Sequence, residues 1–381
     1  MGTEAIGGNI RRIRRSKGLS QKKLAQVAEI SLAGLQNIER RRSVPRVDTL
    51  TALAKVLGVG IQDLVTPVAE LNAVRFRSFK SLKTREQILA DVSRWLQDFN
   101  ELEEMLNEKR GFSLKLPRIG RAAVDPINAA GEVRGQFGLD SKEPVRDICG
   151  LLESNGVKVF SVDVKSDAFF GLSVGVASGG PAIVVNTWDR ISVERQIFTA
   201  AHELGHLVLH LNDYEVEEKD EHKAQEGEAN LFASYFLMPE ETFRKEWNET
   251  CGGFMVDRVL KVKRMFRVSY WTVLFRLSQD VEDKAAFWRN SQVQFKQRFG
   301  RTLLKKDEPD ALAADAFRAS GPEASGTGEP ERLSKADFVQ DRLYFLVRKA
   351  VEGNVVTLSR GAEILGMTVN EMRELSRSWV G

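Results

Sequence analysis

The chain has 381 residues, of which 42% are hydrophobic and 29% are charged. This composition is typical of a soluble globular protein with two or three domains, and it excludes a chain dominated by disorder. The N-terminus lacks the apolar core of a signal peptide, and no segment reaches the roughly 18 apolar residues of a membrane span, so we expect a cytoplasmic protein with no membrane partner. Two cysteines, Cys149 and Cys251, are too few for a disulfide framework or a cysteine zinc site.

Positive charge is concentrated at the N-terminus. Residues 1–65 hold twelve Lys and Arg but only five Asp and Glu, a net charge of +7, whereas the whole chain carries +3. A field of this sign in one small domain favours contact with DNA phosphates and release of their counterions. A basic domain that binds protein is the alternative.

The same segment carries the signals of four short helices. They are a helix with the stripe Ile6, Ile10 and Ile13 that ends at Gly18, a helix at 21–28 capped by Ser20, a helix capped by Ser31 that runs to about Arg41, and a helix at 48–57 ended by Gly58. Pro45 separates the last two.

Residues 19–25 (Leu-Ser-Gln-Lys-Lys-Leu-Ala), with Ile30-Ser31, Ile38-Glu39-Arg40 and Pro45, resemble the phage-repressor-like helix-turn-helix family, called Xre or Cro/C1-type. The likeness covers residues 5–65 and implies a DNA-binding domain over 1–68. Double-stranded DNA would be read by the helix from Ser31 to Arg40, and a homodimer would bind two half-sites. The implied contacts are Leu32, Ala33, Gln36 and Asn37 near base edges, with Gln21 and the arginines at phosphates. Glu29 stands where the family usually has Gly, a departure because residues other than Gly rarely adopt positive φ.

Residues 69–124 are predicted to be a helical connector. Within it, residues 84–106 predict one long helix with an apolar seam whose members alternate at spacings of four and three: Ile88, Val92, Trp95, Phe99, Leu102 and Leu106. The seam fits either a short coiled coil between two copies or a helix docked on the following domain, and the pattern does not separate the two.

From residue 125 to 290 the pattern is mixed α and β. A helix is expected at 145–155 and strands at 157–164, 169–176 and 182–185. An amphipathic helix then opens near Ser192 and runs to about residue 211, and a further helix spans 223–237 after an acidic loop at 213–221. The expected fold is an all-α helix-turn-helix domain, an α+β domain and a helical C-terminal region.

Residues 202–206 read His-Glu-Leu-Gly-His, the H-E-x-x-H pattern, inside the amphipathic helix. Positions i and i+4 of a helix share a face, so His202 and His206 can bind one metal ion while Glu203 lies beside them as a base. Two His and one carboxylate favour zinc, although another divalent transition metal can occupy such a set.

A catalytic zinc site needs a third protein ligand. His210 lies eight residues from His202, about 12 Å along a helix axis, which one ion cannot bridge. His222 falls in the acidic loop. Glu228 is preferred because it shares a helix face with Phe232 and Tyr235, where a buried carboxylate needs a cation. Glu226 is expected to point to the opposite side with Asn230, and His210 is expected to support the site or to belong to the core.

Residues 198–206 (Phe-Thr-Ala-Ala-His-Glu-Leu-Gly-His) with Leu209-His210, Glu228-Ala229-Asn230, Phe232-Ala233 and Leu237-Met238-Pro239 resemble the ImmA/IrrE family of metallopeptidases. The likeness covers about residues 125–280 and implies a zincin-like fold, with His202, His206 and Glu228 as metal ligands and Glu203 as catalytic base. A helix-turn-helix in front of this domain, with a connector sequence like Val74-Arg75-Phe76-Arg77, is a known arrangement in the family. Its members cleave repressor-type transcription factors and so relieve repression of stress or mobile-element genes.

The chemistry expected of such a site is metal-assisted hydrolysis of a peptide bond. Bound zinc lowers the pKa of water toward about 7, and Glu203 accepts its proton and passes it to the leaving amine. We expect residues 182–186 to pair with an extended substrate. His222 and Tyr235 are the available donors for the developing oxyanion.

The C-terminal part is predicted to be a linker over 291–332 and a helical region over 333–381. Residues 358–368 repeat the helix-turn-helix rhythm of the N-terminus, but three Arg and three Glu balance over 354–381, which favours a surface for protein over one for DNA. Two function classes follow: a protease brought to DNA or to a DNA-bound repressor, and a transcription factor whose metal domain senses a ligand or stress without cutting. A regulator of toxin–antitoxin or phage-defence genes is a smaller third possibility.

Overall fold

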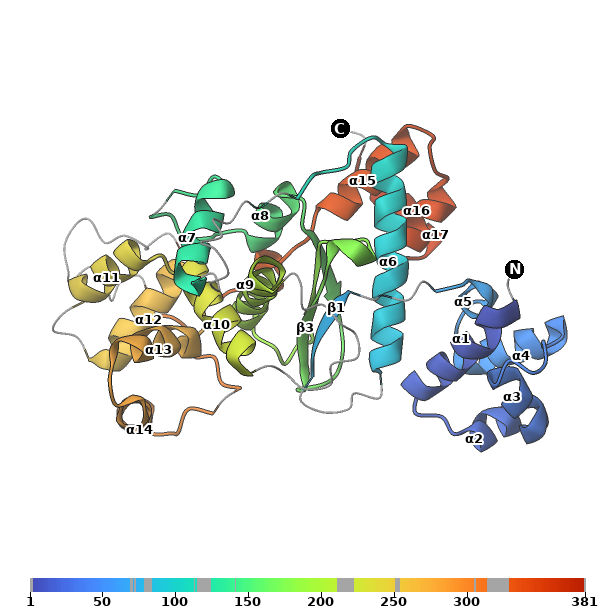
Figure 1. Ribbon diagram of the computed structural model, residues 1–381, viewed down its shortest axis with the longest axis horizontal. Coiled ribbons are helices and arrows are strands. Elements are labelled where there is room, and N and C mark those ends of the chain that lie inside the picture. Colours follow the sequence, from blue (N-terminus) through green and yellow to red (C-terminus); the bar gives the residue numbers. More distant parts are fainter. Residues whose placement is uncertain are drawn as a thin grey trace. The chain divides into compact units, whose positions relative to one another are not determined.

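The computed structural model describes residues 3–68, 71, 73–78, 84–112, 114, 125–140, 142–210, 223–250, 254–304, 306–313 and 329–379 (Figure 1). The chain forms two compact units, one of residues 1–71 with 78–101 and one of residues 72–77 with 102–381. His222, Cys251 and the acidic loop at 213–221 lie outside the described residues. None of the helices in the described part of the chain combines the length and apolarity that a membrane crossing requires.

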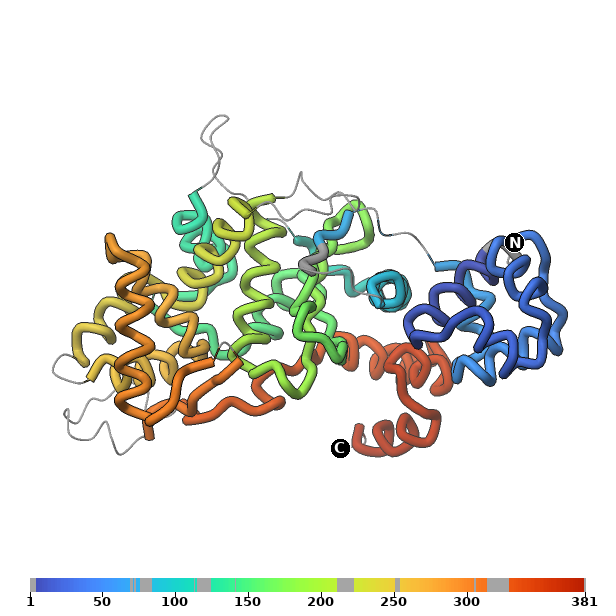
Figure 2. The backbone as a smooth tube through the Cα atoms, turned by 90° about the horizontal axis from the view of Figure 1, so that it is seen from below, coloured from blue at the N-terminus to red at the C-terminus, as the bar shows by residue number. Residues whose placement is uncertain are grey.

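The first unit opens with five helices, drawn in blue in Figures 1 and 2: α1 (Thr3–Ser16), α2 (Gln21–Val27), α3 (Leu32–Glu39), α4 (Val47–Leu57) and α5 (Ile61–Val65). The four predicted helices are confirmed as α1 to α4, with α3 ending at Glu39 rather than Arg41, whereas α5 was not predicted. The Ser20 and Ser31 side chains accept hydrogen bonds from Lys23 N and Gly34 N, and Gly58 ends α4 with φ of 60°. The core includes the predicted stripe of α1 and is closed by Leu24, Leu35, Leu53 and Leu57.

Two arginines of α1 do not have the predicted place at DNA phosphates. Arg14 is only 8% exposed, and its Nε and Nη2 donate to the two carboxylate oxygens of the buried Glu39, at 2.6 and 3.0 Å. Arg12 is buried to the same extent and donates to Asn9. Arg14 therefore fastens α1 to the end of α3, Arg12 bonds within α1, and exposed cations such as Arg40 remain the predicted phosphate contacts.

The turn between α2 and α3 has the strain that its sequence predicts, because Glu29 has φ of 55°. We expect Glu29→Gly to raise the free energy of unfolding of a fragment spanning residues 1–68 by about 0.5–1 kcal/mol, since Gly adopts this conformation without a steric penalty. Urea unfolding followed by circular dichroism measures the change. The control Gln26→Gly, at an exposed helical position, should lower stability by about 1 kcal/mol. A loss of stability in Glu29→Gly would contradict this reading of the turn.

Helix α6 (Arg85–Met105) confirms the predicted long helix. Its seam residues Ile88, Val92, Trp95, Phe99 and Leu102 are all buried within a single chain. Leu106, the last member of the seam, is half-buried, and pairing of this seam between two copies of the protein stays a prediction. The N-terminal part of α6 belongs to the first unit, where Arg94 pairs with Asp63 of α5.

The second unit is built around a four-stranded sheet with the order β1-β3-β4-β2. The strands are β1 (Val74–Ser78), β2 (Lys158–Val162), β3 (Phe169–Val174) and β4 (Ala182–Asn186). β4 is parallel to β2 and antiparallel to β3. β4 is thus an interior strand with both edges paired, so the prediction that residues 182–186 bind the substrate chain is wrong. β1 was not predicted, although its alternation of apolar and basic residues has the period of a strand.

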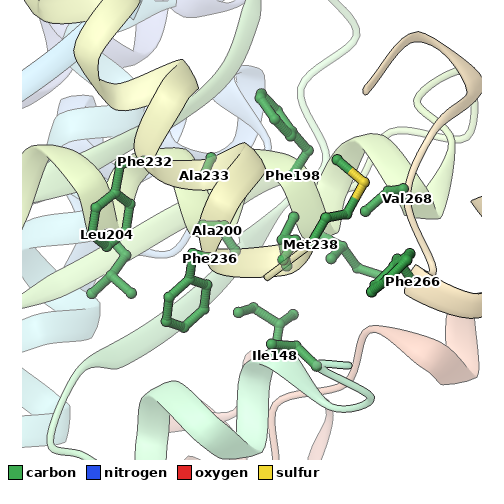
Figure 3. Packing of buried hydrophobic residues seen from close by; sticks show 14 of the residues in the cluster. Ile148, Phe198, Ala200, Leu204, Phe232, Ala233, Phe236, Met238, Phe266 and Val268 are labelled. Atoms are coloured by element: carbon green, nitrogen blue, oxygen red, sulfur yellow. The ribbon is translucent and has the colours of Figure 1, made fainter. Parts of the chain in front are cut away.

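Helices α9 (Val193–Leu209) and α10 (Lys223–Leu237) lie side by side next to this sheet (Figure 1). Ala200 and Leu204 of α9 pack against Phe232, Ala233 and Phe236 of α10, as Figure 3 shows. The remaining helices before the C-terminal region are α7 (Pro126–Gln136), α8 (Ile148–Ser154), α11 (Glu240–Glu249), α12 (Met255–Phe266), α13 (Tyr270–Leu277) and α14 (Lys284–Phe299), with short 3-10 turns at Val176–Ser178, Ser278–Asp280 and Lys335–Asp337.

The segment predicted as a linker, residues 291–332, begins inside α14, where Phe295 is fully buried. Leu303 also belongs to the main core, and the Lys263 ammonium contacts Glu308 at 2.8 Å and Pro309 O at 2.7 Å. These described parts are packed against the second unit. The linker prediction rested on composition alone. A stretch rich in Ala, Pro and charged residues can still be held in place by a few buried contacts, which composition does not indicate.

The C-terminal region folds into α15 (Arg342–Glu352), α16 (Leu358–Ile364) and α17 (Val369–Arg377). The pair α16–α17 repeats the geometry of α2–α3: the two N-cap residues stand eleven positions apart, Ser20 and Ser31 in one pair and Thr357 and Thr368 in the other. Gly366 takes the positive φ that Glu29 has in the first pair. This confirms the repeated rhythm, while a protein-binding role for these helices stays a prediction.

Candidate functional site

The H-E-x-x-H pattern lies in the middle of α9, whose first turn is capped by Ser192 as predicted. His202, Glu203 and His206 are at most 1% exposed. Gly205 allows the close approach of the next helix, because a Cβ there would lie 3.0 Å from the Phe232 ring and 3.3 Å from Ala229 Cα. The motif therefore places two histidines on one face of α9 and a glycine at the point where α10 packs closely against it.

Glu226 brings the third group to the histidines. Its Oε2 lies 3.3 Å from His202 Nε2, its Oε1 lies 3.1 Å from His206 Nε2, and the two Nε2 atoms are 3.0 Å apart. These three residues are the His/Glu cluster found among the described residues. Three ligands about 2 Å from one ion at tetrahedral angles stand about 3.3 Å apart. The described side chains therefore fit a zinc-sized ion without rearrangement of the helices.

The prediction that Glu228 faces the two histidines is wrong, and so is the prediction that Glu226 points away from them. Glu226 and Asn230 do share a helix side, but that side faces α9, and Asn230 Oδ1 lies 3.0 Å from His202 Nδ1. The Glu228 side chain is 39% exposed and its Oε2 contacts His210 Nε2 at 2.8 Å. The Phe232 side of α10 packs against Gly205 in the core, whereas the Glu226 side meets the two histidines.

Hydrogen bonds behind the cluster select one arrangement of protons. If His210 donates from Nε2 to Glu228, its Nδ1 can accept from His206 Nδ1, which lies 3.0 Å away. If His202 donates from Nδ1 to Asn230, the Nε2 lone pairs of both His202 and His206 point at the cluster. Partners of this kind orient metal-binding imidazoles in proteins. His210 and Glu228 thus support His206 from behind.

The electrostatic environment favours the protonation states that metal binding requires. Burial lowers the pKa of His206 well below its ordinary value, although its hydrogen bond with Glu226 acts in the opposite direction. Burial by itself would raise the pKa of Glu226, but its interactions with His202 and His206 outweigh burial and lower that pKa. Neutral imidazoles and an ionised carboxylate are the forms that bind metal.

Glu203 is held beside the cluster by the sheet. Ser173 of β3 donates from Oγ to Glu203 Oε2 at 2.8 Å. Gly171 of the same strand permits this approach, because a Cβ there would lie 2.6 Å from Thr199 and 3.4 Å from Glu203 Cγ. Ser173 was not identified from the sequence, because nothing local to residue 173 indicates a contact with residue 203.

A pocket of about 580 Å³ adjoins the cluster. Two of its lining residues, Asn230 and Phe198, also contact His202. Its other aromatic lining residues are Phe170, Trp271, Phe275 and Trp288. Tyr235, one of the two predicted oxyanion donors, lies elsewhere with the Arg276 guanidinium stacked 3.6 Å over its ring. The other, His222, is outside the described residues.

The residues predicted to contact DNA lie together in the first unit. Ser31, Leu32, Ala33, Asn37 and Arg40 are exposed along α3 and its ends, and Gln36 is half-buried. Gln21, at the start of α2, donates from Nε2 to Glu39 Oε2 at 2.7 Å, which fixes its side chain next to α3.

Comparisons with known proteins match a part of each unit. The family model "Helix-turn-helix" matches residues 10–64, and the peptidase family M78 model "IrrE N-terminal-like domain" matches residues 152–278. The HTH-type transcriptional regulator y4dJ of Sinorhizobium fredii, itself described as uncharacterized, is 43% identical over 65 residues, which are 17% of this chain and 84% of that protein. The chain belongs to the helix-turn-helix family and carries an IrrE N-terminal-like domain.

Two further likenesses are of lower coverage or lower similarity. The HTH-type transcriptional regulator DdrOP3 of Deinococcus deserti is 34% identical over 83 residues, 22% of this chain and 60% of that protein. The crystal structure of Bacillus thuringiensis PlcR in complex with the peptide PapR7 and DNA aligns over 99% of both chains, with 13% identity and a TM-score of 0.17. The two family matches and the two regulators make this protein a helix-turn-helix DNA-binding regulator fused to an IrrE-like domain.

Proposed function

We propose that this regulator uses its IrrE-like domain as a metal-dependent peptidase that cleaves a repressor-type protein and thereby relieves repression under stress or in mobile-element control. The observation that carries the proposal is the convergence of His202 Nε2, His206 Nε2 and a Glu226 carboxylate oxygen within 3.0–3.3 Å of one another. Glu203 stands beside them on the same helix and is 1% exposed. Zinc is the ion that two imidazoles and one carboxylate favour.

Each residue of the site would have a separate role in peptide hydrolysis. His202, His206 and Glu226 would hold the ion, and the chemistry it would supply is Lewis-acid activation of water and of the substrate carbonyl. Glu203 accepts the proton of that water and passes it to the leaving amide nitrogen. Ser173 orients the Glu203 carboxylate through its hydrogen bond. The pocket beside His202, which is lined by both aromatic and charged side chains, would take a substrate side chain next to the scissile bond.

Cleavage by this protein can be tested in cells before its substrate is identified. Cells that express the wild type or Glu203→Gln at equal levels are compared by mass spectrometry of all protein N-termini. We expect new N-termini in a repressor-type DNA-binding protein, or in this protein itself, only with the wild type. Identical sets of N-termini under inducing conditions would contradict the peptidase function.

The helix-turn-helix unit is proposed to read double-stranded DNA through α3. We expect Arg40→Ala to weaken binding to all sequences and to reduce the slope of log K against log salt by about 0.9, because one phosphate contact is lost. Gln36→Ala should instead relax the sequence preference at one base pair, by about 1–3 kcal/mol. Fluorescence anisotropy at several salt concentrations measures both effects, with Arg298→Ala in α14 as a control. An unchanged salt slope in Arg40→Ala would contradict the contact.

A further inference from the structure

The strand β1 comes from the connector and lies at the edge of the sheet beside β3. Residues 72–77 belong to the second unit, whereas the chain before and after them belongs to the first. Gly175 N donates to Ala73 O at 2.9 Å and Ala73 N donates to Ser178 Oγ at 2.7 Å. Val74 is 3% exposed. A short piece of the connector is thus fastened into the sheet of the IrrE-like domain.

The position of β1 is the place where an extended peptide would bind. Without β1, β3 would be the edge strand, and an exposed edge binds a peptide by adding it as another strand. β3 is also the strand that contacts the proposed base, through Ser173 and Gly171. A peptide paired with β3 would therefore pass close to Glu203, as a substrate must.

Arg75 extends from β1 into the cluster. Its Nη1 donates to Gln225 Oε1 at 2.6 Å, and its Nη2 lies 3.7 Å from Glu226 Oε1. The Arg75 side chain is 14% exposed and that of Glu226 is 11% exposed. The guanidinium charge therefore faces the same carboxylate that would bind the metal. Arg75 and a metal cation would repel each other and compete for Glu226.

We propose that residues 73–78 occupy the peptide-binding edge of the IrrE-like domain as an internal substitute for an extended substrate strand. The inference rests on the proposed peptidase function and names the form of its substrate, an extended peptide that replaces β1 beside β3. The resident strand is covalently joined to the helix-turn-helix unit, so it has the high effective concentration of a tethered ligand. A substrate or a metal ion must displace it or weaken its hold.

A synthetic peptide tests the proposal. A fluorescent peptide with the sequence of residues 72–79 is titrated into full-length protein that carries Glu203→Gln, so that cleavage plays no part. We expect the further substitution Arg75→Ala to increase affinity for this peptide about tenfold, because a smaller fraction of the sites holds its own strand. Arg298→Ala, at a surface ion pair of the same unit, is the matched control and should bind as the parent does.

Hydrogen exchange provides an independent measurement. In metal-free wild type the amides of residues 73–78 should exchange slowly, and Arg75→Ala or addition of Zn²⁺ should accelerate them at least about tenfold while β2 and β4 stay protected. Equal peptide affinity in a folded Arg75→Ala variant, or unchanged exchange of β1 with Zn²⁺, would overturn the proposal. Neither measurement depends on proteolysis, so failure of the peptidase function would be seen separately in the comparison of N-termini.

Discussion

Substitution of Glu203 by Gln should lower the rate of peptide hydrolysis by about 10²- to 10⁴-fold, the usual contribution of a general base. Glu203 is not one of the three residues of the cluster, so the variant should keep its metal content, its fold and its affinity for DNA. The amide of Gln can still hydrogen-bond with Ser173 but cannot accept a proton from water. The rate is measured on the protein whose new N-termini appear in the mass-spectrometry comparison, by following the release of its fragments. Glu132→Gln, at an exposed position, is the control.

The same variant separates two ways in which the protein could regulate. If it acts by cutting a repressor, Glu203→Gln should abolish the transcriptional response of the target genes. If the metal domain senses a ligand or stress without cutting, a metal-loaded Glu203→Gln protein should regulate as the wild type does. A normal response from that protein would therefore reject the peptidase function and favour the sensor.

Loss of Glu226 should remove the metal. We expect wild-type protein to bind about one zinc ion per chain, and Glu226→Ala or His202→Ala to retain none after dialysis, because a catalytic site needs three protein ligands. Glu228→Ala should retain the metal with affinity lowered about 10- to 100-fold, since Glu228 acts only through His210 and His206. Metal analysis by mass spectrometry and competition with a zinc-binding dye give the content and the affinity.

The pair Glu226 and Glu228 is its own matched control, because both residues lie in α10 two positions apart. Complete loss of zinc in Glu228→Ala together with full retention in Glu226→Ala would show that the ligand is Glu228 after all. Circular dichroism of each variant distinguishes loss of a ligand from loss of the fold.

The helix-turn-helix unit was largely predictable because its signals are local. Ser20 and Ser31 cap their helices through hydrogen bonds to residues three positions ahead, and Gly58 ends α4 through its own backbone angles. The roles of Arg12 and Arg14 were not predictable in this way. Whether a basic residue of α1 meets DNA or Glu39 depends on how α1 packs against α3, and a net charge contains no such information.

The amino-acid sequence by itself determined the features that depend on one element: the family of each unit, the helix of His202 and His206, and the presence of Glu203 beside them. Spacing along one helix is enough there, because positions i and i+4 share a face whatever surrounds them. Only the tertiary structure decided which carboxylate completes the cluster, because that depends on the rotation of α10 about its axis relative to α9. It also decided that β1 fills the edge of β3 and that Arg75 reaches Glu226, since a contact between residues about 150 positions apart is set by the packing of the whole unit.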